Sequence, residues 1–174
     1  MNGHGPDPID RKILALLQEN AKMPQAEVAK AVGLTAPSVN ERIRKLERAG
    51  YIRGYVALLD DKKLGNDITA FVEVFVEHPK FEQEFIQAVE GLDEVLECHH
   101  ITGEFSLLLK IKVADMAAFR RLLIEELNTI RGVRQTRTVM VLATAKEQHR
   151  IKIDTQPTPA DPAAGHPVRE RRVR

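Results

Sequence analysis

The sequence predicts an α+β protein with a helical N-terminal domain followed by an antiparallel β-sheet domain. Residues 36–49 place apolar side chains at helical spacing, whereas residues 69–77 alternate apolar side chains with the period of a β-strand. Between these segments, residues 61–68 form a charged connection that contains glycine. We therefore expect a first domain over residues 1–60, a linker over 61–68 and a second domain over residues 69–147.

The first domain is predicted to hold three helices. The first opens with Asp7 and Pro8, an N-cap followed by a proline in the first turn, and the second covers residues 24–32. The third covers residues 36–49 and follows Thr35, another natural N-cap. Two short helices joined by a turn that contains glycine are typical of a helix-turn-helix motif.

The two sides of the helix over residues 36–49 differ in character. Val39, Ile43 and Leu46 form an apolar stripe that faces the core, and the other side and its flanks are polar and largely basic. Recognition helices press such polar side chains against DNA, so we expect this side to contact DNA rather than to be merely solvated. The expected DNA-contacting residues are Ser38, Asn40, Glu41, Arg42, Arg44, Lys45 and Arg48. Residues 51–59 have β character and would add a wing to the motif.

The second domain is predicted to follow the order βαββαβ, a ferredoxin-like arrangement with both helices on one face of the sheet. The expected strands cover residues 69–77, 94–102, 105–113 and 133–144, and the expected helices cover 80–91 and 115–132. The second of these helices is expected to turn inward Met116, Phe119, Leu123, Leu127 and Ile130. The uncovered sheet face would expose Phe71 and Phe75, so the pattern also predicts a homodimer.

Charge is distributed unevenly along a chain whose formal net charge is only +1. Residues 1–60 hold nine basic and seven acidic side chains, residues 61–147 hold eleven and fifteen, and residues 148–174 hold six and three. A basic first domain followed by an acidic second domain is typical of a protein that binds nucleic acid through one domain only. The single cysteine favours a reducing compartment, and no apolar run is long enough to span a membrane. With the expected DNA binding, we therefore expect a cytoplasmic, nucleoid-associated protein that binds no membrane.

From Gln148 onward the sequence is rich in proline and ends in a basic cluster. Residues 151–154 could add a short strand, but the remainder cannot bury enough apolar surface to order itself. We interpret residues 148–174 as a solvated basic tail, with an auxiliary contact to the DNA backbone as the alternative. The basic residues of its end are Arg169, Arg171, Arg172 and Arg174.

Three segments together resemble one protein family. They are IDRKIL near the N-terminus, AEVAKAVGLTAPSVNERIRKLERAGYIRGYVALLD after it, and ECHHITGEF in the second domain. Over residues 7–147 the chain resembles the leucine-responsive regulatory protein/AsnC family of transcription regulators. The resemblance implies a winged helix-turn-helix joined to an effector-binding domain. It also implies dimers that assemble into octamers or other higher oligomers, with amino acids or related metabolites bound between subunits.

The resemblance places an effector site at the turn within ECHHITGEF. The site residues that it implies are Thr102, Gly103, Glu104, Phe105 and Ser106, and the last strand could add the hydroxyls of Thr136 and Thr138. The family's turn usually carries a second acid where this chain has Ser106, which offers only a neutral hydrogen bond to an ammonium group. Either Glu104 takes over that cation, or the ligand is not a plain amino acid.

Other chemistry finds little support in the sequence. Cys98, His99 and His100 are consecutive on a predicted strand, so at most two of them point the same way, whereas structural zinc needs four ligands. We find no glycine-rich phosphate loop and no nucleophile placed beside a base, and so expect no metal, no cofactor and no enzymatic activity. Besides an effector-responsive, sequence-specific regulator, the alternatives are a DNA-organising protein of low specificity and a metabolite-sensing or enzymatic protein whose helical head binds another protein.

Overall fold

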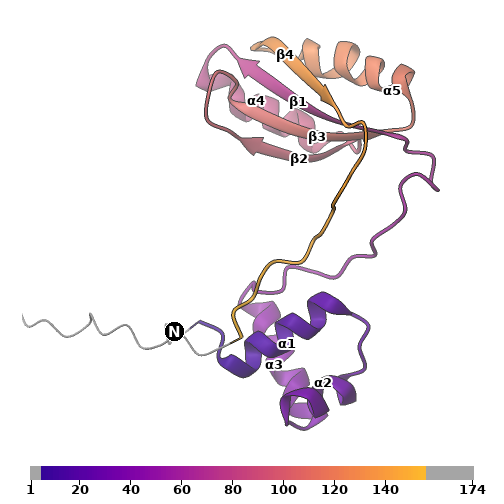
Figure 1. Cartoon of the computed structure of the whole chain (residues 1–174). Helices are drawn as coiled ribbons and strands as arrows, with labels where there is room; N and C mark the ends of the chain where they lie inside the picture. The colour runs from indigo at the N-terminus through magenta and orange to yellow at the C-terminus, as the bar shows by residue number, and fades with distance from the viewer. Residues whose placement is uncertain (1–4, 156–174) are drawn as a thin grey trace, which may run out of the picture. The chain divides into compact units, whose positions relative to one another are not determined.

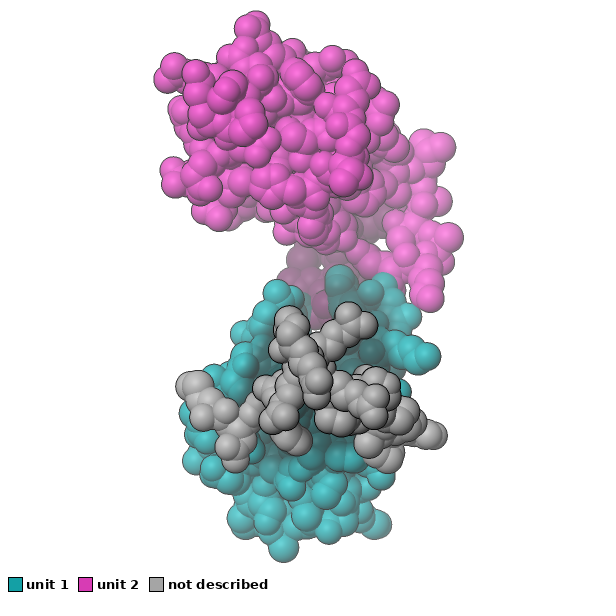
Figure 2. All heavy atoms as spheres, turned by 90° about the vertical axis from the view of Figure 1, so that its left-hand side faces the viewer, with its two compact units in different colours: residues 1–57, 148–174 teal, residues 58–147 magenta. Residues whose placement is uncertain are grey.

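The computed structural model describes residues 5–155 and divides them into two compact units (Figures 1 and 2). The first unit comprises the described residues up to Ala57 together with residues 148–155, and the second is Leu58–Glu147. The four arginines at the end of the chain, Arg169, Arg171, Arg172 and Arg174, lie outside the described residues.

The first unit contains the three predicted helices, α1 (Pro8–Glu19), α2 (Gln25–Val32) and α3 (Ala36–Arg48). Asp7 caps α1 through a capping box with Asp10: each carboxylate accepts a hydrogen bond from the other residue's backbone N–H. The helices bury a small aliphatic core made of Ile13, Val28, Ala29, Val39, Ile43 and Leu46. The predicted apolar stripe of α3 is therefore confirmed.

Residues 51–59 do not form the predicted wing strand. Their backbone has no regular structure, and no described segment pairs with them. The side chains of Tyr55, Val56, Leu58 and Leu59 are exposed. The side chains have β character, but a strand also needs a partner for its backbone groups, and the single chain supplies none here.

The second unit is built on a four-stranded antiparallel sheet (Figure 1). Its strands are β1 (Ile68–Val76), β2 (Val95–His100), β3 (Leu107–Val113) and β4 (Val133–Met140), in the spatial order β2-β3-β1-β4. The central strand β1 buries Ala70, Val72, Val74 and Val76 on one face, as predicted. The helical segments pack on this face, which confirms the βαββαβ fold.

The helical segments on the sheet are less regular than predicted. The first consists of a 3₁₀ turn, Pro79–Phe81, followed by α4 (Glu82–Glu90). The second begins as α5 (Met116–Arg121), continues as a π-helical stretch over Leu122–Glu126 and ends in a 3₁₀ turn over Leu127–Thr129. Phe85 and Val89 from the first, with Phe119, Leu122 and Leu127 from the second, fill the core above the sheet.

Two of the predicted inward residues of the second helical segment are corrected. Met116 is 57% exposed, because it lies in the first turn beside the N-cap Asp115. Leu122 rather than Leu123 belongs to the buried core, whereas Leu123 is partly buried and packs against it. The π-helical stretch widens the spacing of inward residues from four to five, so that Leu122 and Leu127 share one face.

Gly132 provides a test of this packing. Its φ is +90°, and a Cβ at this position would lie 2.5 Å from Cβ of Phe81. We expect Gly132→Ala to lower the free energy of unfolding of the second unit more than Gly65→Ala does, by about 1–3 kcal/mol. Gly65 is the matched control, because its φ is also positive but no atom lies within 4 Å of an added Cβ. Equal losses in denaturant unfolding would contradict this account of the turn.

Candidate nucleic-acid interface and effector turn

α3 begins at a well-defined cap and presents its polar side outward. The hydroxyl of Thr35 accepts a hydrogen bond from the backbone N–H of Ser38, and the two hydroxyls lie 2.9 Å apart. This cap fixes the first turn, which in helix-turn-helix proteins approaches the bases. The predicted contact residues that are exposed on this side are Ser38, Glu41, Arg44, Lys45 and Arg48.

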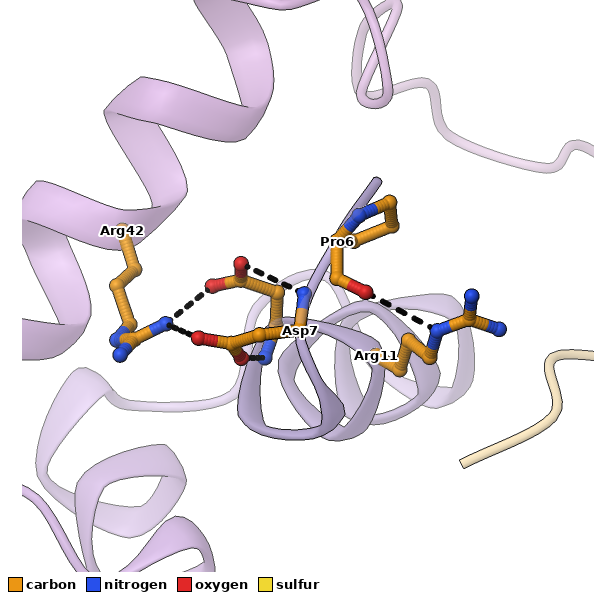
Figure 3. Close-up of polar contacts among 5 residues, drawn as sticks. Pro6, Asp7, Arg11 and Arg42 are labelled. Carbon is orange, nitrogen blue, oxygen red and sulfur yellow. Dashed lines mark hydrogen bonds and ion pairs between the residues drawn. The ribbon is translucent and has the colours of Figure 1, made fainter. Parts of the chain in front are cut away.

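Two predicted contact residues are held by other parts of the first unit. Asn40 is half-buried, and its side-chain oxygen accepts a hydrogen bond from Nε2 of Gln25 on α2. Arg42 turns toward α1, where Nη1 lies 2.6 Å from Oδ2 of Asp7 and 2.7 Å from Oδ1 of Asp10 (Figure 3). In the structure, Arg42 therefore joins α3 to α1 and does not point outward with the other basic residues.

The ion pairs of Arg42 shift the pKa values of the groups involved. Burial alone would raise the pKa of Asp7, but the backbone N–H of Asp10 and the guanidinium of Arg42 outweigh it and lower this pKa. The hydrogen bonds with Asp7 and Asp10 raise the pKa of Arg42. Asp10 is only 8% exposed, so the guanidinium supplies charge and hydrogen bonding to a carboxylate that water barely reaches.

The predicted effector turn is a six-residue connection between β2 and β3, longer than the sequence suggested. The N–H of Ile101 donates to the carbonyl of Ser106 at 3.0 Å and closes the turn. Phe105 is buried, and the hydroxyl of Ser106 is buried with no hydrogen-bond partner among residues 5–155. An unpaired buried hydroxyl is uncommon in folded proteins. The remaining predicted residues of the turn, Thr102, Gly103 and Glu104, are exposed.

Arg137 on β4 also contacts this turn, and it was not among the predicted site residues. Its guanidinium lies 5.0 Å from the centre of the Phe105 ring and forms an ion pair with Glu73 on β1. This ion pair lowers the pKa of Glu73 and raises that of Arg137. Alternation along β4 places Arg137 opposite Glu73 on the open sheet face, but only the register of the strands reveals the pair.

Thr136 and Thr138 lie on the helix-covered face of the sheet. They pair in register with Val74 and Val72, whose side chains lie on the helix-covered face. The hydroxyl of Thr136 donates to Oδ1 of Asn128 at 3.3 Å. Within one chain these threonines are therefore directed away from the open face.

The Cys98-His99-His100 segment is not arranged as a metal site. Cys98 is half-buried against the core, and burial raises the pKa of its thiol. Nε2 of His99 lies 2.9 Å from Oε2 of Glu97, whereas Nδ1 of His100 lies 3.8 Å from Oε2 of Glu82. Within residues 5–155 no group of three or more histidine, cysteine or acidic side chains is placed to hold a metal ion. None of the helices in the same range is both long and apolar enough to cross a membrane.

Comparison with known proteins also finds a DNA-binding part followed by a ligand-binding part. A model of a winged helix-turn-helix DNA-binding domain matches residues 6–53, and a model of the Lrp/AsnC ligand binding domain matches residues 69–151. The leucine-responsive regulatory protein of Escherichia coli K12 is 41% identical over 152 residues, which cover 86% of this chain and 93% of that protein. The chain belongs to the Lrp/AsnC family.

Solved structures of Lrp/AsnC proteins match the whole architecture. E. coli AsnC is 30% identical, with a TM-score of 0.78 over 83% of this chain and 97% of its own. A transcriptional regulator from Neisseria meningitidis in complex with L-methionine is 31% identical, with a TM-score of 0.80 over 84% and 96%. Like its relatives, this chain is a DNA-binding transcription regulator with a ligand-binding domain.

The position of Arg42 leads to a prediction about stability. Arg42→Ala should lower the free energy of unfolding of the first unit by about 1.5–3 kcal/mol, because it leaves the buried carboxylate of Asp10 without its charged donor. The matched control is Arg44→Ala, since Arg44 is exposed on the same helix. Equal stability of the two variants in thermal unfolding would contradict the proposal that Arg42 stabilises the contact between α3 and α1.

The same contact should make the stability of the first unit depend on pH. Because folding lowers the pKa of Asp7, the pair stabilises the folded state above the ordinary pKa of an aspartate. This contribution disappears as the pH falls through the lowered value of the folded state. Arg42→Ala should therefore flatten the loss of stability on acidification, while Arg44→Ala should keep the wild-type profile.

Proposed function

We propose that this regulator binds specific DNA sites through the outer side of α3 and responds to a small effector bound at the turn between β2 and β3. The observation that carries the first part is the exposed row of Arg44, Lys45 and Arg48 on the second helix of a helix-turn-helix. Selection of bound fragments from genomic DNA, with and without a panel of amino acids, tests both parts. Recovery of the same random fragments under all conditions would instead indicate a DNA-organising protein of low specificity.

The buried hydroxyl of Ser106 supports a ligand at the turn. A ligand or a second subunit that offers a polar group to this hydroxyl would satisfy it, and the adjacent Glu104 is exposed and negatively charged. Structures of two related regulators, from N. meningitidis and Mycobacterium tuberculosis, contain L-methionine. We infer an amino acid whose ammonium group is bound by Glu104, or a related metabolite without that group.

The open face of the sheet supports assembly of the chain with itself. Phe75 is 37% exposed and Val139 is 51% exposed on this face, and a second copy would cover them. Tyr55, Val56, Leu58 and Leu59 form another exposed apolar segment that a second copy could pair with. We infer that the dimer is the basic unit and that higher oligomers, such as an octamer, form from it, with the effector bound between subunits.

The basic row of α3 leads to a prediction about DNA binding. Arg44→Ala should weaken binding to a selected duplex without lowering stability, because the side chain is exposed and off the apolar stripe. A base contact would cost about 1–3 kcal/mol and relax the preference at one position, whereas a phosphate contact would reduce the salt slope by about one. Arg120→Ala, an exposed arginine of α5, is the control and should leave the affinity unchanged. Wild-type affinity of Arg44→Ala in fluorescence anisotropy would reject the assigned face.

Ser106 leads to a prediction about ligand choice. Ser106→Asp should strengthen binding of free amino acids relative to their keto-acid analogues, because a carboxylate forms a charge-assisted hydrogen bond with an ammonium group. Isothermal titration calorimetry of the two ligand sets against wild type, Ser106→Asp and Ser106→Ala measures the change. If neither substitution alters the affinity for any ligand, this turn is not the effector site.

A further inference from the structure

The segment that follows the effector-binding unit returns to the DNA-binding unit and contacts α1. Residues 148–155 belong to the same compact unit as α1, although the 90 residues of the second unit, Leu58–Glu147, lie between the two parts of this unit in sequence. Gln18 on α1 binds both backbone groups of Ile151: its Nε2 donates to the carbonyl at 3.1 Å, and its Oε1 accepts from the N–H at 2.9 Å. A side-chain amide thus replaces the strand partner that this backbone would otherwise need.

Two further contacts extend this attachment along α1. Nη1 of Arg11 donates to the carbonyl of Asp154 at 3.1 Å, and Nη1 of Arg150 lies 3.7 Å from Oε1 of Glu19. Gln18 and Glu19 lie in the last turn of α1 and Arg11 lies near its start, so the segment runs alongside the helix. Each contact is exposed and weak on its own, but the segment is covalently attached, so the contacts form together at a small entropic cost.

The far end of this attachment lies beside the residues that hold α3. Nε of Arg11 also donates to the carbonyl of Pro6 at 3.1 Å (Figure 3). One guanidinium therefore joins the C-terminal segment to the residue before the N-cap of α1. The next residue, Asp7, caps α1 and binds Arg42 of α3. A continuous series of contacts therefore runs from Asp154 through the first turn of α1 to the recognition helix.

We propose that residues 150–154 form a C-terminal clamp on α1 that positions the recognition helix for DNA. The inference rests on the proposed DNA-binding role of α3 and adds a segment outside the helix-turn-helix to that function. The clamp fixes Pro6 and the capping turn of α1, so the carboxylates of Asp7 and Asp10 have less freedom to move. Because Arg42 binds both carboxylates, α3 is in turn restrained against α1. Gln18 and Arg11 are then positioning residues, which affect DNA affinity without touching DNA.

Variants that release the clamp provide the test. Gln18→Ala should weaken binding to a labelled duplex, selected by the wild-type protein from genomic DNA, by about threefold or more, because it removes both bonds to Ile151. The salt slope should stay at the wild-type value, since no phosphate contact is lost. Gln148→Ala is the matched control, an exposed glutamine in the same segment, and should bind as wild type.

Truncation separates the clamp from the basic end of the chain. A chain ending at residue 155 keeps the clamp and should bind the duplex with the affinity that Gln148→Ala shows. A chain ending at residue 147 should bind as weakly as Gln18→Ala. If removal of residues 156–174 alone accounts for the whole loss and reduces the salt slope, the arginines of the tail contact DNA and the clamp proposal is overturned.

A double substitution shows whether the effect passes through Arg42. In an Arg42→Ala background, Gln18→Ala should cause no further loss of affinity, because the connection to α3 is already broken. Thermal unfolding of each variant, with affinities compared below the onset of unfolding, separates positioning from loss of fold. Additive effects of Gln18→Ala and Arg42→Ala would overturn the proposal, as would wild-type affinity of Gln18→Ala. A wild-type protein that selects no DNA would instead overturn the proposed function.

Discussion

Burial of Val39, Ile43 and Leu46 determines which side of α3 faces outward. Once these three side chains pack against the other two helices, the helical period directs the exposed basic residues toward solvent. Arg42 lies at the border between the two sides and turns inward, where Asp7 and Asp10 bind it. The orientation of the recognition helix therefore depends on an apolar contact along its length and on an ionic contact at its edge.

The fold was largely predictable, because most helices and strands can be recognised from the local periodicity of their apolar residues. The alternation in β1, the stripe of α3 and the caps Asp7, Thr35 and Asp115 need only short stretches of sequence. The errors arose where a partner distant in sequence, or an irregular turn, decides the structure. Residues 51–59 have the side chains of a strand, but no described strand pairs with them. The π-helical stretch after α5 places Leu122 in the core instead of the predicted Leu123.

The candidate sites were predictable in outline and less so in detail. The exposed basic side chains of α3 follow from its period, whereas the inward turn of Arg42 depends on where α1 begins. In the same way, the sequence marks Ser106 as unusual, but only the strand register places Arg137 beside Phe105 and directs Thr136 to the other side of the sheet. Residue type predicts which chemistry is possible, and register decides which groups meet.

The contact between Gln18 and Ile151 has a consequence for the order in which the chain acquires its structure. A ribosome makes α1, α2 and α3 before the second unit, and residues 148–155 after it. The three helices can therefore collapse early, while the outer side of α1 stays without its last contacts until the whole effector-binding domain has been synthesised. A nascent chain that ends before residue 148 would therefore lack the hydrogen bonds that Ile151 and Asp154 make with α1.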